Sequence, residues 1–314
     1  MLSDIFKEHI DIENNFIHLH SESEHANQKQ TNESFSEKWI AYDKTEGKWT
    51  WYQFQKEWYL ELYGFDNEKE FSGFLKTKKY IFDAGCGLGY KAHWFAELSP
   101  SSIVIGMDYS DSVYVASNNY KNVNNLYFIK GDIADTPFKD KSIDYVSCDQ
   151  VIMHTENPEK TFKELTRITK KSGEFSCYVY SKKALPRELI DDYFRIETKK
   201  LSHEQLWEMS EQLTKLGKIL SELNIEVDIP DIPMLGIKGG KQDLQRFVYW
   251  NFIKCFWNEE FGEETSIFTN FDWYSPSNAK RYNESEYKEM IKENNLEIIY
   301  FHKEEACYSG RFKR

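Results

Sequence analysis

The chain has 314 residues, and its 40 basic and 52 acidic side chains leave a formal net charge of -12. This charge disfavours binding to a phosphate backbone, so we expect no nucleic-acid substrate. The mean hydropathy is -0.69, and no apolar run approaches the roughly 18 residues that a membrane span needs. We therefore expect a soluble, cytoplasmic protein without a membrane span.

The cysteines and histidines do not form the usual metal motifs. Five cysteines, at positions 86, 148, 177, 255 and 307, are odd in number and never form a C-x-x-C pair. A disulfide framework and a structural zinc site are both disfavoured by this spacing. His18, His20 and His25 lie close together in the sequence but have no companion cysteine. We therefore expect no metal site.

The first region of the chain differs from the rest in composition. Residues 1–38 are acidic, hold four of the eight histidines and show no sustained hydrophobic period. This pattern is typical of an irregular or loosely packed arm. From Trp39 to Phe74 the chain is strongly aromatic, and a helix is expected around residues 51–63. We expect residues 1–74 to form an N-terminal arm and an aromatic lid.

From Lys79 onward, short apolar strands alternate with amphipathic helices. The predicted strands span residues 80–84, 103–108, 126–132, 143–148, 174–180, 296–302 and 307–313. Strands that alternate with helices at this spacing indicate a parallel sheet with right-handed crossovers. The predicted fold class is α/β, Rossmann-like and doubly wound, with a mostly parallel seven-stranded sheet.

Between residues 184 and 270 this alternation stops. Six apolar residues here repeat at intervals of three and four: Leu206, Met209, Leu213, Leu216, Leu220 and Leu223. Such a stripe packs a helix within an inserted cap, or forms the seam of a homodimer. A second, aromatic helix is expected from Asp243 to Trp257. We assign residues 184–270 to an inserted helical cap, and residues 75–183 and 271–314 to the core.

A glycine-rich turn follows the first core strand and opens a helix. Its sequence is Asp83-Ala84-Gly85-Cys86-Gly87-Leu88-Gly89, and glycine allows a ligand to approach the backbone closely. The third position of a dinucleotide fingerprint falls on Tyr90. This departure disfavours a nicotinamide dehydrogenase. The acid at the start of the turn would repel a pyrophosphate but can accept from an ammonium group.

Two further acids follow the next two strands. Asp108 ends the second strand, where a carboxylate can bind both ribose hydroxyls. Asp132 follows the third strand and is placed to accept from an adenine amino group. Each acid alone is more often a solvated strand end. Together with Asp83, however, they form a specific signal beside the glycine turn.

In these motifs the chain resembles the class I S-adenosyl-L-methionine (SAM)-dependent methyltransferases. The resemblance rests on DAGCGLG at 83–89, the acid of GMDYS at 106–110 and GDI at 131–133. Within the class, the chain looks like bacterial methyltransferases of surface-glycan and secondary-metabolite pathways, in which a sequence like QTNESFSEKW (30–39) precedes the core. The resemblance implies SAM as the cofactor. The cofactor-binding residues implied are Asp83, Gly85, Gly87, Asp108, Tyr109, Asp132, Ile133, Asp149 and Gln150.

Methyl transfer from a sulfonium chiefly requires alignment of the nucleophile, the methyl group and the sulfur. A base is needed only for a poor nucleophile, and candidates lie at the carboxyl ends of strands four and five. His154 is the catalytic candidate, because an imidazole can take the proton of a hydroxyl. The alternative is a structural histidine that caps the helix starting at Asn157.

Contacts to the acceptor are expected from two regions. Phe35 and Trp39 lie in the arm, whereas Asp272, Tyr274 and Arg281 follow the cap. A packed turn that ends at a proline is the alternative for the second group. The adjacent acids at 191–192 resemble a paired carboxylate site for a divalent ion. A solvated helix start is the better interpretation.

The leading hypothesis is a SAM-dependent methyltransferase that acts on a small or medium polar acceptor. O-methylation is slightly favoured, in glycan or secondary-metabolite biosynthesis. One alternative is an enzyme that uses SAM for another transfer, and another is a non-catalytic SAM-binding scaffold. The expected partner is a small-molecule substrate, and a homodimer follows if the leucine stripe is a seam.

Overall fold

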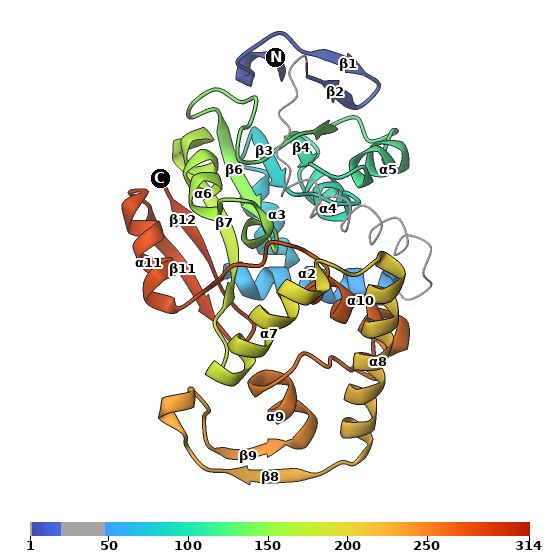
Figure 1. The fold of residues 1–314 in the computed structure, drawn as a ribbon. Coiled ribbons are helices and arrows are strands. Elements are labelled where there is room, and N and C mark those ends of the chain that lie inside the picture. The colour runs from blue at the N-terminus through green and yellow to red at the C-terminus, as the bar shows by residue number, and fades with distance from the viewer. Residues whose placement is uncertain (1, 20–47) are drawn as a thin grey trace. The chain divides into compact units, whose positions relative to one another are not determined.

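The computed structural model describes residues 2–19 and 48–314, which divide into two compact units (Figure 1). Of these described residues, unit 1 comprises 2–19, 52–181 and 280–314, and unit 2 comprises 48–51 and 182–279. Phe35 and Trp39, the predicted acceptor contacts of the arm, lie outside the described residues. Over the described residues, no helix combines the length and the apolarity needed to cross a membrane.

Unit 1 is built on one large sheet with the strand order β1-β2-β5-β4-β3-β6-β7-β12-β11, and β10 pairs with the end of β7. Its strands have these bounds: β1 Asp11–Glu13, β2 Phe16–His18, β3 Tyr80–Ala84, β4 Ile103–Asp108, β5 Leu126–Lys130, β6 Ile143–Cys148, β7 Thr169–Ser181, β10 Arg281–Tyr282, β11 Glu297–Lys303 and β12 Cys307–Lys313. The five adjacent strands β5, β4, β3, β6 and β7 are parallel, and β12 is antiparallel to both of its neighbours, β7 and β11.

The chain moves outward from β3 through β4 to β5, and then returns to β6 and moves the other way to β7. This reversal makes the sheet doubly wound, and ligands bind at the carboxyl ends of the strands beside such a switch point. Seven neighbouring strands, in the order β5-β4-β3-β6-β7-β12-β11, confirm the predicted Rossmann-like, mostly parallel seven-stranded sheet. The hairpin β1-β2 and the short β10 are additions to it.

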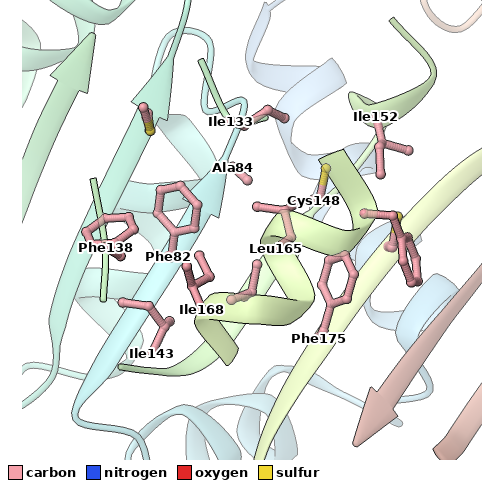
Figure 2. Packing of buried hydrophobic residues seen from close by; sticks show 14 of the residues in the cluster. Phe82, Ala84, Ile133, Phe138, Ile143, Cys148, Ile152, Leu165, Ile168 and Phe175 are labelled. Carbon is pink, nitrogen blue, oxygen red and sulfur yellow. The ribbon is translucent and has the colours of Figure 1, made fainter. Parts of the chain in front are cut away.

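Helices cover both faces of this sheet. They are α2 Lys48–Tyr63, which begins in unit 2, α3 Glu68–Leu75, α4 Tyr90–Leu98, α5 Ser112–Asn119, α6 Pro158–Ile168 and α11 Glu284–Glu293. Side chains alternate between the two faces, so Phe82 packs with α6 and α11 whereas its neighbour Ile81 packs with α2 to α5. Figure 2 shows Leu165 and Ile168 of α6 directed toward Phe82 and Phe175 of the sheet.

The N-terminal residues are more ordered than the sequence indicates. A short 3₁₀ helix, η1 (Leu2–Ile5), precedes β1 and β2, and β2 adds a parallel strand beside β5. Ile5, Phe6 and Ile17 are buried. The prediction of an irregular, loosely packed arm is therefore wrong for residues 2–19. Strands of three residues are too short to produce a hydrophobic period, so pairing with β5 is what orders them.

Unit 2 is mainly helical and also contains a hairpin. Its elements are α7 Leu185–Thr198, α8 His203–Glu222, β8 Glu226–Ile229, η3 Pro233–Leu235, β9 Gly240–Asp243, α9 Leu244–Asn251 and α10 Gly262–Tyr274. The antiparallel pair β8-β9 is not predicted by the sequence. The aromatic helix predicted from Asp243 to Trp257 is α9, which is capped by Asp243 and ends at Asn251.

The leucine stripe forms a single helix, α8, as predicted, but only part of the stripe is buried. Leu206 and Leu213 are buried, whereas Leu216 and Leu223 are 39% and 51% exposed. The buried face of α8 is rotated relative to the stripe and includes Gly217. A Cβ at Gly217 would overlap the backbone of Cys255. The homodimer stays a prediction.

The first of the two adjacent acids in α7 is not solvated. Asp191 is completely buried and accepts hydrogen bonds from Arg187 Nε at 2.7 Å, Trp273 Nε1 at 2.9 Å and the Tyr274 hydroxyl at 2.9 Å. The interpretation of a solvated helix start is therefore wrong for Asp191. A buried carboxylate needs such donors, and two of the three come from a helix about 80 residues away.

Candidate active site

The glycine turn is held tightly against the end of β4. Gly85, Gly87 and Gly89 have φ angles of 83°, 52° and 75°, which side-chain-bearing residues rarely adopt. A Cβ at Gly85 would overlap the side chain of Val151, and one at Gly89 would lie 2.7 Å from the ring of Phe128. The turn therefore requires glycine for conformation and for space.

Asp83 stands at the start of this turn, near the end of β3. It is almost fully buried, and its Oδ2 has no hydrogen-bond partner among the described residues. Burial raises the pKa of Asp83 to about 7, although the nearby Lys91 opposes this shift. A buried carboxylate oxygen without a donor is costly. A cationic donor supplied by a ligand would offset that cost.

Asp108 connects the glycine turn to the end of β4. Its Oδ2 accepts from the backbone N–H of Gly87 at 2.8 Å, and its Oδ1 accepts from the N–H of Ser110 at 2.8 Å and the hydroxyl of Ser110 at 2.6 Å. Burial raises the pKa of Asp108, and these hydrogen bonds act in the opposite direction. Asp108 therefore shapes the loop as well as lying where the sequence predicts ribose binding. Tyr109, beside it, is half-buried.

The third predicted acid lies on the loop after β5. Gly131 N–H donates to the carbonyl of Asp108 at 3.0 Å, so this loop adjoins the end of β4. Asp132 Oδ1 accepts from the N–H of Ala134 at 2.8 Å. Ile133 is buried in the core cluster that includes Ala84, and both are labelled in Figure 2. The three acids predicted from the sequence thus lie at or just after the carboxyl ends of the neighbouring strands β3, β4 and β5.

Asp149, at the end of β6, is surrounded by donors that the sequence analysis does not identify. Its carboxylate accepts from Lys91 Nζ at 2.5 Å and from the Tyr63 hydroxyl at 2.7 Å. Gln150 has a positive φ of 63°, and its side-chain amide donates to Gln55 Oε1 at 2.7 Å. The sequence does contain a signal for Lys91. This lysine lies on the apolar face of its helix, where a lysine needs a carboxylate partner.

A network of buried hydroxyl groups lies on the same face of the sheet as Asp149. The Tyr59 hydroxyl lies 2.7 Å from that of Tyr145 and 2.9 Å from that of Ser147. Tyr145 in turn donates to Ser176 at 2.8 Å. Burial raises the pKa of Tyr59 well above its usual range, so the phenol stays protonated. Fully satisfied networks of this kind rigidify the elements they join.

His154 lies in the short 3₁₀ helix η2 (Ile152–His154), just beyond the end of β6. Its Nε2 is 3.3 Å from the hydroxyl of Tyr180, near the end of β7. Asn157 caps its own helix by accepting from the N–H of Lys160, so the cap does not need His154. Arg281 of β10 pairs with Tyr180 in register. His154, Tyr180 and Arg281 therefore come from segments that meet at the carboxyl edge of the sheet.

The remaining predicted acceptor contacts belong to unit 2. Asp272 and Tyr274 lie in the last turns of α10. Tyr274 is completely buried, and its hydroxyl donates to Asp191 and accepts from the N–H of Lys254 at 3.2 Å. Its phenol is therefore used inside unit 2.

Comparison with known proteins agrees with this geometry. A family described as "Methyltransferase domain" matches residues 75–241, which is more than half of the chain. The chain is a member of the class I SAM-dependent methyltransferases. This membership confirms the resemblance drawn from the glycine turn and the acids that follow β4 and β5.

Two curated methyltransferases illustrate how far the likeness extends. The sterol 24-C-methyltransferase erg6 of Schizosaccharomyces pombe is 32% identical over 108 residues, 33% of this chain and 28% of the relative. The demethylmenaquinone methyltransferase of Staphylococcus carnosus is 32% identical over 117 residues, 36% of this chain and 47% of the relative. The chain thus aligns with less than half the length of either methyltransferase.

Among solved structures, PKMT2 from Rickettsia typhi shares the fold of this methyltransferase. It has a TM-score of 0.52 and 15% sequence identity, and the alignment covers 81% of this chain and 50% of that one. At this identity the likeness concerns the fold alone.

The residues at the glycine turn fit the cofactor of this family. SAM carries an ammonium group, and Asp83 offers a buried acceptor oxygen without a donor among the described residues. The turn itself excludes side chains, so backbone would meet the ligand. A methyltransferase cofactor therefore suits this site better than a pyrophosphate, which Asp83 would repel.

Proposed function

We propose that this methyltransferase transfers a methyl group from SAM to a hydroxyl group of a small or medium polar acceptor. One observation carries the proposal: among the described residues, the buried Asp83 Oδ2 has no donor, and it lies at a turn that only glycine can form. An ammonium group is the ligand feature that would best compensate for this oxygen. The surface-glycan and secondary-metabolite precursors implied by the sequence resemblance are the acceptor classes to test first.

In this proposal the cofactor residues are those at the strand ends. Asp83 binds the ammonium group, Asp108 the ribose and Asp132 the adenine edge. Asp149 and Gln150 flank the methionyl part, while Tyr109 and Ile133 complete the adenosine side. Bound SAM supplies a methyl group on an already activated leaving group. Alignment of the reacting groups can lower such a barrier by about 7–11 kcal/mol.

His154 is the proposed general base for the acceptor hydroxyl. Asp149 is the nearest alternative in sequence, but both of its oxygens already accept short hydrogen bonds from Lys91 and Tyr63. Proton transfer to Asp149 would require breaking one of these bonds. His154 Nε2 instead lies 3.3 Å from the hydroxyl of Tyr180, which can orient the imidazole. Arg281, beside Tyr180, is a proposed contact for a polar acceptor.

The domain assignment belongs to the same proposal. Residues 1–74 are assigned to the arm and lid, residues 184–270 to the cap and the remainder to the cofactor-binding core. Phe35, Trp39 and Asp272 are the proposed acceptor contacts from the arm and the cap region, whereas the predicted contact Tyr274 is buried with its hydroxyl bonded inside unit 2. Substitution of each proposed contact by alanine tests this role, because an acceptor contact changes KM for the acceptor without changing affinity for SAM.

Calorimetry and a methyl-transfer assay test the function in sequence. The full chain is expected to bind SAM and S-adenosylhomocysteine, and to bind NAD more weakly than either. A panel of hydroxyl, amine and carbon acceptors is then incubated with methyl-labelled SAM, and products are identified by mass. Stronger binding of NAD contradicts the cofactor assignment. Tight SAM binding without transfer to any acceptor favours a scaffold, and transfer only to amines or carbons contradicts O-methylation.

A further inference from the structure

The turn between β11 and β12 brings three different metal-binding side chains to one face of a hairpin. His302 pairs with Ser309 in register, and Glu304 N–H donates to the carbonyl of Cys307 at 3.1 Å, which closes the hairpin. Side chains two apart on a strand share a face, and so do those directly opposite. The face is the one toward α2, because the Ser309 hydroxyl donates to the carbonyl of Leu62.

The donor atoms of these side chains are spaced as metal ligands are. Glu304 Oε2 lies 3.5 Å from His302 Nε2, and Glu304 Oε1 lies 3.5 Å from Cys307 Sγ. One donor atom from each side chain falls within 4.8 Å of the other two. Bonds of about 2.0–2.3 Å to a tetrahedral ion place its ligands about 3.3–3.8 Å apart. Small side-chain rotations would therefore suffice for coordination.

The surroundings of the three groups also suit an ion. Cys307 is completely buried, and the side chains of His302 and Glu304 are 12% and 28% exposed. His302 Nε2 is buried without a hydrogen-bond partner among the described residues, although the Glu304 carboxylate is within ion-pair distance. Hydrogen bonding within the cluster therefore leaves this nitrogen unsatisfied, and a metal ion would use its lone pair.

The types of ligand define the class of ion. A thiolate, an imidazole and a carboxylate suit zinc and similar divalent transition metals, whereas calcium and magnesium prefer oxygen ligands alone. Three protein ligands with a water at the fourth position are a common zinc arrangement.

We propose that His302, Glu304 and Cys307 bind one zinc-like divalent transition-metal ion. The site goes beyond the proposed methyl transfer, and it departs from the expectation of no metal site. Cys307 pairs with Tyr180 in register, so the ion would fix the hairpin turn beside the strand end that carries the proposed acceptor site. Binding releases the thiol proton, because the thiolate is the ligand.

Cobalt titration of the full chain tests this site. The protein is stripped with a chelator, kept reduced and titrated with Co²⁺. We expect one ion per chain, visible absorption of tetrahedral intensity and a thiolate-to-cobalt charge-transfer band. Zn²⁺ should displace the cobalt and raise Tm. Cys307→Ser should abolish the charge-transfer band, and His302→Gln should weaken binding by more than the roughly 10–100-fold cost of losing an outer-shell partner.

Matched controls separate this site from adventitious binding. His93→Gln removes another histidine that lies near a glutamate, 3.6 Å from Glu97, and Cys255→Ser removes another buried thiol. Both should bind cobalt like the wild type. Glu304→Gln, at the more exposed ligand, provides a third test if the other two ligand variants fail to fold. Absence of stoichiometric binding, or a charge-transfer band that survives in Cys307→Ser, overturns the proposal.

Discussion

At the scale of single residues, Asp83 links the pH dependence of stability to the proposed binding of SAM. Its pKa is raised to about 7, chiefly by burial. The folded state therefore binds more protons than the unfolded chain between about pH 4 and pH 7, and the contribution of Asp83 to stability falls as pH rises through this window. An ammonium ligand favours the ionised form. The proposed binding of SAM therefore favours the ionised carboxyl group of Asp83, whereas folding favours the protonated one.

We predict that SAM binding weakens as pH falls below about 7, by up to about tenfold per pH unit, because Asp83 must then lose a proton to bind an ammonium group. Calorimetry across this range measures the affinity. Asp83→Asn should bind SAM weakly with little of this pH dependence, and should lose less stability than the wild type as pH rises. A wild-type affinity that is constant from about pH 5.5 to 8 would remove Asp83 from the ammonium site.

His154 is the second residue whose role can be measured directly. If it is the general base, His154→Ala should lower kcat by about 10²–10⁴ while affinity for SAM stays nearly constant. His154→Asn should be almost as slow, because an amide cannot accept the proton. Tyr180→Phe, which keeps the ring but removes the hydroxyl 3.3 Å from His154 Nε2, should cause a smaller loss. An active His154→Asn enzyme would indicate a structural histidine.

At the scale of elements, the part of α2 that belongs to unit 1 packs against the start of α4, which follows the glycine turn, and against the end of β6. Tyr52, Gln55, Tyr59 and Tyr63 recur at helical spacing. The ring of Tyr52 stacks on that of Tyr90 at the start of α4, with centroids 4.2 Å apart and an angle of 13°. Gln55 and Tyr63 reach the end of β6. The predicted aromatic helix therefore exists, and its rings cover α4 and the strand ends.

The ion pair between α4 and β6 should be essential for stability. Lys91→Met leaves the Asp149 carboxylate buried, since its side chain is 2% exposed, and should cost about 3–5 kcal/mol of unfolding free energy. Adding Asp149→Asn should recover part of this loss. Lys130→Met breaks a surface pair, with side chains 38% and 60% exposed, and should cost only about 0–1 kcal/mol. Equal losses from the two lysine variants in urea denaturation would contradict this reading.

At the scale of the whole molecule, the described chain forms two compact units, each with buried residues of its own. Unit 1 holds every described residue of the proposed cofactor site, together with His154. Unit 2 is organised around the buried Arg187–Asp191 pair and its tryptophan and tyrosine donors. A ligand that binds only folded unit 1 stabilises that unit by mass action.

We therefore expect two unfolding transitions in calorimetry. S-adenosylhomocysteine at about 100 times its Kd should stabilise one of them by about 2.7 kcal/mol and leave the other in place. Asp191→Asn should lower the Tm of the other transition, that of unit 2, without changing cofactor affinity. A single transition that shifts as a whole with the ligand would mean that the units unfold together.

The sequence by itself determined the α/β alternation, the glycine turn and the acids at the strand ends. These features depend on neighbouring residues: a period of two or 3.6, a glycine where φ is positive, and an acid directly after a strand. The same local information predicted α2 and α8 as helices. It indicated the leucine stripe as the packed face of α8, which is only partly correct, because the face that is buried depends on what packs against the helix.

Only the tertiary structure decided which distant groups meet. Lys91 and Tyr63 are far from Asp149 in the chain, and Asp191 receives donors from α10; none of these partners follows from spacing. The strands near the N-terminus exist because β5 offers them a free edge. The cluster at His302 and Cys307 depends on the register of a hairpin. Burial and pairing are properties of the folded chain, so local patterns could not reveal them.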